Sequence, residues 1–366
     1  MTDAIIWLIA LPLAGALAAL LLPRAATAVV AGTGVATGIS AAALLHGVAT
    51  QGPLHYQIGG WSAGLGIALH ADGLSALLLM MIALVVLAAS VYASDYFKTA
   101  AERARFWPLW LLLWTALNAL LLSGDLFNLY VTLELLGLSA VALAAVGGKT
   151  AAVAAALRYL LVGLLGSMMF LAGVTLIYAG YGTLDMAQLA RGVTAGPVAW
   201  TALALMTAGL LLKTALFPLH FWLPPAHASA PAPVSAVLSA LVVKAAFYLV
   251  LRLWLDVFAD VVTPAAATLL GALGAAAVLW GSWHALLAER LKLLAAYSTV
   301  AQLGYLFMFF PLLQALPAGA ARELAAGGLV MLALTHGFAK AGLFLAIGII
   351  QQRSGHDSIR QLDGTA

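Results

Sequence analysis

The chain has 366 residues, of which 64% are hydrophobic and only 8% are charged, and its mean hydropathy is +1.08. Soluble domains are about 45–50% apolar and about 25% charged, so this composition excludes a soluble globular enzyme, a nucleic-acid-binding protein and a disordered chain. The net charge of +3 arises from scattered residues, and the lack of cysteine excludes disulfides, iron–sulfur clusters and zinc–thiolate sites within the chain.

Apolar runs of membrane-spanning length follow one another along the chain, separated by short polar, proline- or glycine-containing breaks. They predict an all-α polytopic membrane protein with eleven transmembrane helices at 4–22, 26–48, 71–93, 107–123, 126–146, 151–179, 198–217, 229–255, 264–287, 292–314 and 325–351. The first run lacks a positively charged start, so we expect a spanning helix rather than a cleaved signal peptide.

Two segments between these runs are too polar or too short to span. Residues 49–70, rich in glycine and aromatic residues, predict an interfacial loop or a small hairpin, and residues 183–191 predict a short surface helix. Asp72 stands at the start of a span, where a helix cap is the favoured role. The glycines of 32–38 lie within an apolar run and indicate helix packing rather than a phosphate-binding loop.

Lysine and arginine are distributed unequally between the two sets of loops. If residue 1 lies outside, the outer loops hold Arg191, Arg252 and Arg322, and the cytoplasmic loops hold Arg24, Lys98, Arg103, Arg105, Lys149, Arg290, Lys292, Arg353 and Arg360. The positive-inside rule therefore predicts a multi-pass protein of the cell inner membrane, with a periplasmic N-terminus and the C-terminus of this chain in the cytoplasm. Arg158 lies near the cytoplasmic end of its span, where snorkelling favours a role as an interface anchor.

Five ionisable residues lie well inside spans: Glu134, Lys213, Lys244, His336 and Lys340. A lysine at a helix centre costs roughly 2.5–3.5 kcal/mol on the insertion scale, so such residues are usually functional. A buried glutamate–lysine pair could serve only to hold two helices together, but that role explains one lysine and not three. The set therefore favours a proton relay at the middle of the membrane.

The segment between Lys213 and Lys244 contains five prolines: Pro218, Pro224, Pro225, Pro231 and Pro233. Each removes a backbone donor and disfavours helix at the preceding residue, so the spans are expected to be interrupted here. Broken helices beside buried charges are typical of ion pathways. His220 and His227 also lie in this segment, although each taken alone is more typical of a packed histidine.

His336 and Lys340 are four residues apart and therefore share one helix face. A histidine titrates near neutral pH and could exchange a proton with a buried lysine. The alternative is a histidine that is hydrogen-bonded to a carbonyl of a neighbouring helix.

Several motifs resemble the antiporter-like membrane subunits of respiratory complex I. They are K-T-A-x-F-P-x-H-x-W-L-P-x-A-H from residue 213, D-G-L-S at 72–75, L-E-L-L-G-L-S at 133–139, L-L-A-A-Y-S-T-V-A-Q-L-G-Y at 293–305 and H-G-F-A-K-A-G-L-F-L at 336–345. The same family includes the large Mrp-type cation/proton antiporter subunits and the membrane arms of energy-converting hydrogenases.

This resemblance implies a bundle of about fourteen helices with two inverted repeats, each containing one broken helix. Residues 1–106 would be N-terminal helices, 107–258 the first repeat with its break near 213–233, and 259–366 an incomplete second repeat. The chain stops before the family's second broken helix, so we expect a fragment or a split chain.

The resemblance also implies roles for individual residues. Glu134 matches the carboxylate of the family's charge pair, Lys213 the pumping lysine, and Lys244 the connecting lysine, while His336 and Lys340 match the central relay. Gln302 stands where some members have histidine.

The expected function is proton translocation as an antiporter-like subunit of a multisubunit membrane complex, driven by partners because no redox or nucleotide site is visible. The alternatives are an Mrp-type Na⁺(K⁺)/H⁺ antiporter subunit, or a scaffold or proton-flux partner of another complex, such as one for inorganic carbon uptake. We expect other membrane subunits, protons and lipid as partners, and Na⁺ or K⁺ in the antiporter alternative, with no nucleic acid, cofactor or metal. Whether the assembly is an enzymatic translocase or a secondary antiporter stays open.

Overall fold

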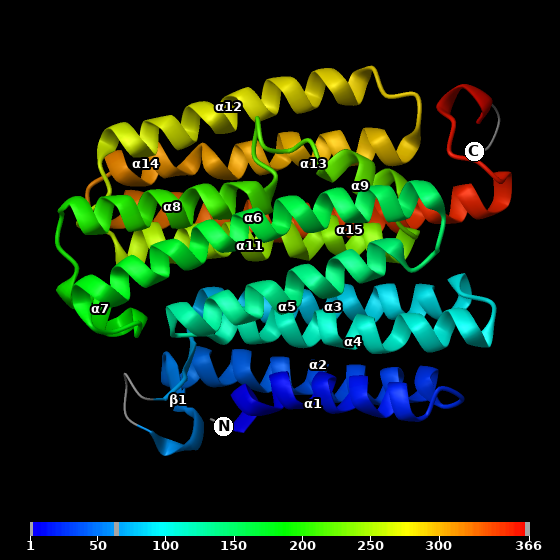
Figure 1. Ribbon diagram of the computed structural model, residues 1–366, viewed down its shortest axis with the longest axis horizontal. Helices are drawn as coiled ribbons and strands as arrows, with labels where there is room; N and C mark the ends of the chain where they lie inside the picture. Colours follow the sequence, from blue (N-terminus) through cyan, green and yellow to red (C-terminus); the bar gives the residue numbers. More distant parts are fainter. Residues whose placement is uncertain (1–2, 62–65, 363–366) are drawn as a thin grey trace.

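The protein is a bundle of long helices that lie side by side and run back and forth along the molecule (Figure 1). A computed structural model describes residues 3–61 and 66–362. Within these residues, 11 helices are long and apolar enough to cross a membrane, which confirms the predicted number and the all-α class. This architecture satisfies the backbone hydrogen bonds of each span internally, as the hydrocarbon core requires.

Nine of these spans are single α-helices: α1 (Asp3–Leu21), α2 (Ala26–Gln51), α3 (Gly73–Tyr96), α4 (Ala100–Leu122), α5 (Leu126–Ala145), α6 (Thr150–Tyr181), α8 (Pro197–Thr214), α12 (Pro264–Leu286) and α15 (Ala320–Ser354). The other two are composite. One contains α10 (Ala232–Val237), the π-helical turn η2 (Leu238–Val242), α11 (Val243–Arg252) and a second π-helical turn, η3 (Leu253–Val257); the other contains α13 (Leu291–Phe307) and α14 (Phe309–Ala315).

Helix boundaries differ from the sequence expectation where polar residues belong to a helix. Helix α4 begins at Ala100 instead of 107 because Thr99 and Glu102 form a capping box, in which each side chain bonds the other's backbone N–H. Arg103 and Arg105 therefore lie in the first turns of this helix and not in a loop. Hydropathy alone misses such polar first turns.

The predicted hairpin and short helix lie at one end of the bundle, together with the start of α1 (Figure 1). Strands β1 (Leu54–Gln57) and β2 (Ala68–Ala71) pair antiparallel, and the turn η1 (Ile58–Gly60) follows β1, which confirms the hairpin alternative. Residues 62–65 of the predicted segment lie outside the described residues. The short helix is α7 (Met186–Gly192). We call this end of the bundle the hairpin end.

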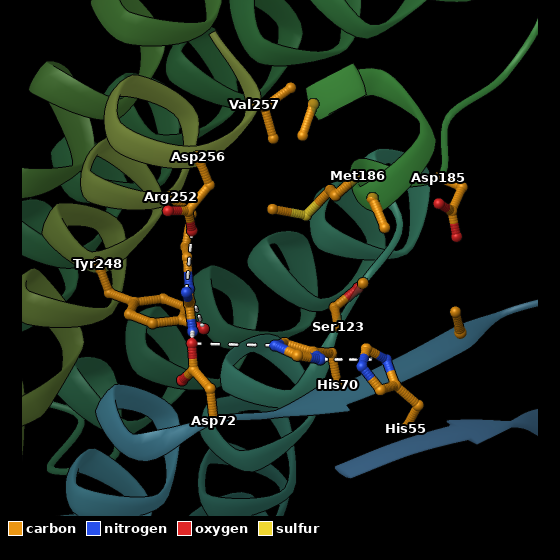
Figure 2. Close-up of a pocket in the computed structure, with 14 residues that line it drawn as sticks. His55, His70, Asp72, Ser123, Asp185, Met186, Tyr248, Arg252, Asp256 and Val257 are labelled. Carbon is orange, nitrogen blue, oxygen red and sulfur yellow. Dashed lines mark hydrogen bonds and ion pairs between the residues drawn. The ribbon is translucent and has the colours of Figure 1, made fainter. Parts of the chain in front are cut away.

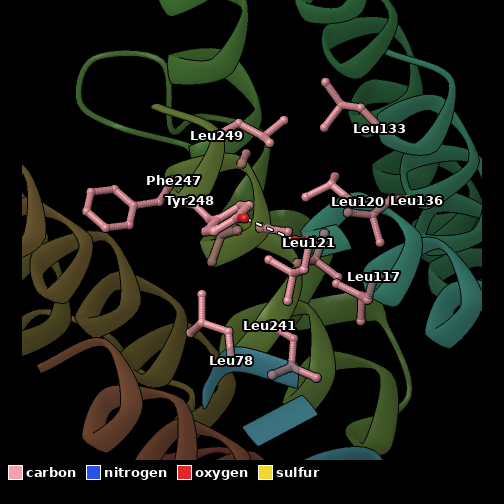
Figure 3. Close-up of a cluster of buried hydrophobic side chains, with 14 of the residues drawn as sticks. Leu78, Leu117, Leu120, Leu121, Leu133, Leu136, Leu241, Phe247, Tyr248 and Leu249 are labelled. Carbon is pink, nitrogen blue, oxygen red and sulfur yellow. Dashed lines mark hydrogen bonds between the residues drawn. The ribbon is translucent and has the colours of Figure 1, made fainter. Parts of the chain in front are cut away.

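The composite span Ala232–Val257 is the central helix of the bundle, because its spanning window is 100% buried. Leucines of α3, α4 and α5 surround it, among them Leu78, Leu121 and Leu133, and Leu241 of its own turn η2 lies in the same buried cluster (Figure 3). Tyr248 of α11 donates a hydrogen bond to the carbonyl of Leu121, at 3.0 Å. In lipid such contacts stabilise by close packing and hydrogen bonding rather than by exclusion of water.

Glycines allow α6 and α8 to approach each other closely. A Cβ atom on Gly209 of α8 would lie 2.2 Å from the carbonyl oxygen of Gly166 on α6, and one on Gly166 would lie 2.7 Å from the carbonyl oxygen of Gly209. Small residues at such crossings are typical of transmembrane helix contacts. Since Lys213 follows Gly209 by about one helical turn, this contact fixes the position of Lys213 along the axis of α6.

The two ends of the bundle differ in charge. The connections after α1, α3, α5 and α12, and residues 355–362 after α15 with the turn η4 (Ile359–Gln361), all lie at the end opposite the hairpin (Figure 1). The nine basic residues that the sequence assigned to one side lie in these regions or in the helix turns next to them. The unequal distribution is therefore a property of the folded bundle.

Candidate functional site

The predicted helix break lies between α8 and α10. Helix α8 ends at Thr214, a non-helical stretch follows, α9 spans Leu223–Ser229, and α10 begins at Ala232. Ala215 adopts a left-handed conformation (φ 55°) at the end of α8. Trp222 closes this helix end, because its indole N–H donates to the carbonyl of Leu212 (2.8 Å) while its ring stacks on Tyr159 of α6.

Lys213 and Glu134 form an ion pair immediately before this break. The ammonium nitrogen of Lys213 lies 3.5 Å from a carboxylate oxygen of Glu134 on α5, and the two side chains are 8% and 19% exposed. A cavity of about 10 Å³, close to the size of one water molecule, lies beside the pair. A buried charge pair next to a helix end can change its protonation with a small movement of either group, because distance controls the attraction.

Lys244 lies near the middle of the central helix and is buried. The π-helical turn η2 directly precedes α11, and Lys244 donates to the carbonyl of Ser239 within that turn, at 3.2 Å. Ser239 in turn shares a hydrogen bond of 2.7 Å with Thr299 of α13. π-helical turns are frequent at functional sites, because they offset the hydrogen-bond ladder and expose carbonyls.

Helix α15 brings His336 and Lys340 to the same buried face. Lys340 donates to the carbonyl of Ala295 (3.1 Å) and to the hydroxyl of Ser298, both on α13. Neither ring nitrogen of His336 bonds to any of the described residues, so the alternative of a carbonyl-bonded histidine is wrong for this structure. His336 lies within electrostatic range of both Lys244 and Lys340.

The predicted residues thus form two groups. Lys213 and Glu134 are one, and Lys244, His336 and Lys340 are the other, drawn from the central helix and α15. In the described part of the chain, no direct hydrogen bond joins Lys213 to Lys244. Proton passage between the groups would therefore need water or side-chain movement.

The residues of the break have unequal environments. Pro224 is buried, Pro225 is partly buried and Pro218 is exposed. His220 is buried between Phe217 and Trp280, as expected of a packed histidine. His227 is fully buried, its ring stacks on Phe344 with centroids 4.9 Å apart, and neither ring nitrogen bonds to a described residue.

Sequence reasoning placed Lys292 in a cytoplasmic loop, and this was wrong. It lies in the first turn of α13, is buried, and donates to the carbonyl of Ala230 at 2.8 Å, next to the break. The signal was present, because apolar residues flank Lys292 on both sides. Ser298 was also missed, and only the fold places it against Lys340.

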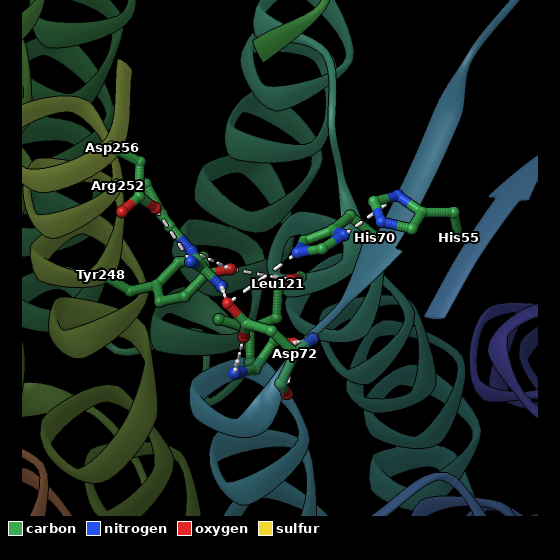
Figure 4. A network of polar contacts seen from close by, with 8 residues as sticks. His55, His70, Asp72, Leu121, Tyr248, Arg252 and Asp256 are labelled. Atoms are coloured by element: carbon green, nitrogen blue, oxygen red, sulfur yellow. Dashed lines mark hydrogen bonds and ion pairs between the residues drawn. The ribbon is translucent and has the colours of Figure 1, made fainter. Parts of the chain in front are cut away.

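Arg252 likewise belongs to a helix rather than to an outer loop, since it is the last residue of α11. Its guanidinium contacts Asp72 at 2.6 Å and Asp256 at 2.9 Å, and its Nε donates to the Tyr248 hydroxyl (Figure 4). Asp72 caps α3 as predicted, through the backbone N–H of Ser75. Burial opposes its ionisation, but His70 and Arg252 hold the pKa of this carboxyl well below its usual range.

Residues 123–366, which contain the break and both groups of buried charges, match the model of the family described as "NADH:quinone oxidoreductase/Mrp antiporter, TM". The chain belongs to this family. Its sequence is 37% identical over 373 residues to NADH-quinone oxidoreductase subunit N of Desulforudis audaxviator, covering 99% of this chain and 72% of that protein. It is 29% identical over 314 residues to a Na⁺/H⁺ antiporter subunit of Alkalihalophilus pseudofirmus, covering 84% of this chain but only 61% of that protein.

Chains of two solved structures have the same fold. A chain of the membrane-bound sulfane sulfur reductase, an archaeal respiratory membrane complex, superimposes with a TM-score of 0.92 at 30% identity, over 100% of this chain and 74% of that one. A chain of the Mrp complex from Dietzia sp. gives a TM-score of 0.88 at 29% identity, over 98% and 66%. This chain is thus an antiporter-like subunit, and its neighbours of known structure belong to multisubunit membrane complexes.

Proposed function

We propose that this chain translocates protons across the membrane within a multisubunit complex, through Glu134, Lys213, Lys244, His336 and Lys340. The observation that carries the proposal is the Glu134–Lys213 ion pair at the broken helix, nearly out of contact with solvent. A buried ion pair is weak as a source of stability, whereas a buried pair beside a helix break is well suited to storing and releasing a proton.

The mechanism follows from the attraction between the two groups. With Glu134 ionised and close, Lys213 holds its proton. When partner subunits displace or neutralise Glu134, the buried ammonium loses its counter-charge, and the proton moves on through water towards Lys244 and His336. Lys340 and Lys244 repel each other as cations, so arrival of a proton at one favours its release from the other.

Coupling to a second ion is the alternative form of this proposal. The relative from Alkalihalophilus pseudofirmus is named as a Na⁺/H⁺ antiporter component, and the one from Desulforudis audaxviator as part of an NADH-quinone oxidoreductase. The first supports antiport of a cation and the second supports a proton pump driven by a redox reaction. Identification of the subunits that co-purify with this chain separates the two, and a scaffold role would leave transport independent of its lysines.

The orientation proposed is the one with the basic end in the cytoplasm. Because the chain has no cysteine, single cysteines introduced at Lys98 and Arg191 report the two ends directly. A membrane-impermeant maleimide added to intact cells should label the second position and not the first; the reverse pattern would invert the proposed orientation.

Transport by the assembled complex in proteoliposomes tests the relay. Lys213→Ala should abolish proton uptake, and so should Lys213→Arg, because a guanidinium keeps the charge pair but does not release its proton. Lys98→Ala is the matched control, since Lys98 is exposed and pairs with the exposed Asp95. Normal transport by a correctly assembled Lys213→Arg complex would refute the proposed function.

A further inference from the structure

A polar cavity of about 320 Å³ opens at the hairpin end, outside the proposed relay. His55 and His70 of the hairpin, Asp72, Asp185, Arg252 and Tyr248 line it (Figure 2). Backbone hydrogen bonds fix its walls: Gly124 donates to Ala68 of β2, and Met186 of α7 donates to Gly124, each at 2.9 Å. The hairpin, the start of α5 and the start of α7 are therefore held together as one rim.

The outer part of this cavity contains a histidine pair. Nδ1 of His70 lies 3.2 Å from Nδ1 of His55, and Nε2 of His70 lies 3.9 Å from Asp72 (Figure 4). The other charged groups that line the same cavity are Asp72 before α3, Asp185 before α7, and Arg252 and Asp256 from the central helix. Three carboxylates against one guanidinium make the cavity favourable for a positive charge.

Tyr248 connects the cavity to the protein interior. Its hydroxyl accepts a hydrogen bond from Arg252 on the cavity side (2.9 Å) and donates one to the carbonyl of Leu121 on the inner side (3.0 Å). Tyr248 follows Lys244 by four residues in α11, so the two lie one turn apart on the same face. A second cavity, of about 10 Å³, is lined by both Leu121 and Lys244, and it is close to the size of one water molecule.

These contacts form a polar line that runs from the histidine pair through Asp72 and Arg252 to Tyr248 and the Leu121 carbonyl. The small cavity lined by Leu121 and Lys244 separates the end of this line from the proposed relay. The remaining side chains around Lys244 in that small cavity are apolar, namely Leu78, Met81, Ile82 and Leu241. Tyr248 is thus the polar side chain that joins the cavity lining to the surroundings of Lys244.

We propose that this cavity is a proton port, through which Lys244 exchanges protons with the aqueous phase at the hairpin end by way of His70 and Tyr248. Inward transfer breaks the Tyr248 O–H bond towards water beside Lys244, and the phenol oxygen takes a replacement proton from water in the cavity. The His55–His70 pair passes protons at the mouth, because an imidazole ring carries one nitrogen that can donate a proton and one that can accept it. This inference rests on the proposed function, because the port would connect the proposed relay with the aqueous phase.

Transport by the assembled complex in proteoliposomes tests the port, with the pH on the hairpin side varied while the other side is held constant. Tyr248→Phe should lower the rate about tenfold or more, because it removes one proton-transfer group. His70→Gln should abolish the dependence of the rate on the pH of the hairpin side and leave the dependence on the other side unchanged. A purely structural role for His70 would lower the rate equally at every pH.

Two substitutions are the matched controls. His46→Gln changes an exposed histidine of α2 near the hairpin end, and Tyr178→Phe changes a 60% exposed tyrosine of α6. Both should transport normally. If Tyr248→Phe fails to assemble, His70→Gln decides the question, because the hairpin lies outside the helix bundle. Wild-type rates and pH profiles in both Tyr248→Phe and His70→Gln would refute the port. If Lys213→Arg still loses transport in that case, the proposed function stands. Transport by Lys213→Arg would refute that function instead.

Discussion

Replacing Glu134 with glutamine tests the charge pair without a change of shape. At a separation of 3.5 Å and an effective dielectric constant of about 20, the attraction is about 332/(20 × 3.5), or about 5 kcal/mol. Water in the small cavity beside the pair would screen part of this value, and we expect roughly half of it. A loss of about 2.5 kcal/mol corresponds to a change of about 50- to 100-fold in how firmly Lys213 holds its proton.

The assay is proton uptake by the assembled complex in proteoliposomes, measured as a function of pH. Glu134→Gln should transport at a small fraction of the wild-type rate, because the lysine no longer alternates between a paired and an unpaired state. Glu323→Gln is the control, since it removes an exposed carboxylate at the start of α15. If Glu134→Gln assembles and keeps both the wild-type rate and pH profile, the pair has no part in transport and the electrostatic reasoning is wrong.

Three further predictions concern packing, the second group of charges and pH. Gly209→Ala should lower the Tm of the purified complex, at a cost of about 1–3 kcal/mol, whereas Gly163→Ala, with nothing within 4 Å of the added Cβ, should not. Ser298→Ala removes a hydrogen bond to Lys340 and should lower the transport rate. A rate equal to the wild type would count against a role of Ser298 in the relay. Asp72→Asn should lower Tm at neutral pH, with the difference narrowing as the pH falls below about 3.8, because the folded pKa of this carboxyl lies below that ordinary value; a difference that does not narrow on acidification would contradict this.

The sign of the last prediction follows from linkage. A carboxyl whose pKa is depressed on folding adds stability above its unfolded pKa, and this contribution is lost as the pH falls towards the folded value. The contacts responsible are those with Arg252 and His70. Tm measured by differential scanning fluorimetry on the wild type and Asp72→Asn across this range checks the window.

Much of the site could be predicted from the sequence because charge is scarce in a membrane protein. Glu134, Lys213, Lys244, His336 and Lys340 stand out against apolar surroundings, and the helix break follows from the prolines between the first two lysines. The roles of these residues and the division into inverted repeats remain predictions, since they rest on resemblance and on the proposed mechanism.

Residues at helix ends were harder to interpret. Lys292 and Arg252 stand near polar breaks in the sequence, so hydropathy assigned both to loops, yet each side chain lies inside the bundle. A lysine in the first turn of a helix is buried or exposed according to what packs against that turn. Only the position of the break relative to α13 buries Lys292 against Ala230.

The sequence by itself determined the number of spans, the location of the break and the end at which basic residues gather, because all three depend on local composition and on the length needed to cross a bilayer. The tertiary structure decided which charges meet. Lys213 pairs with Glu134 from a different helix, Lys340 binds α13, and Tyr248 joins an outer cavity to the surroundings of Lys244. These contacts depend on how helices that are distant in sequence pack side by side, and neither hydropathy nor residue spacing specifies that packing.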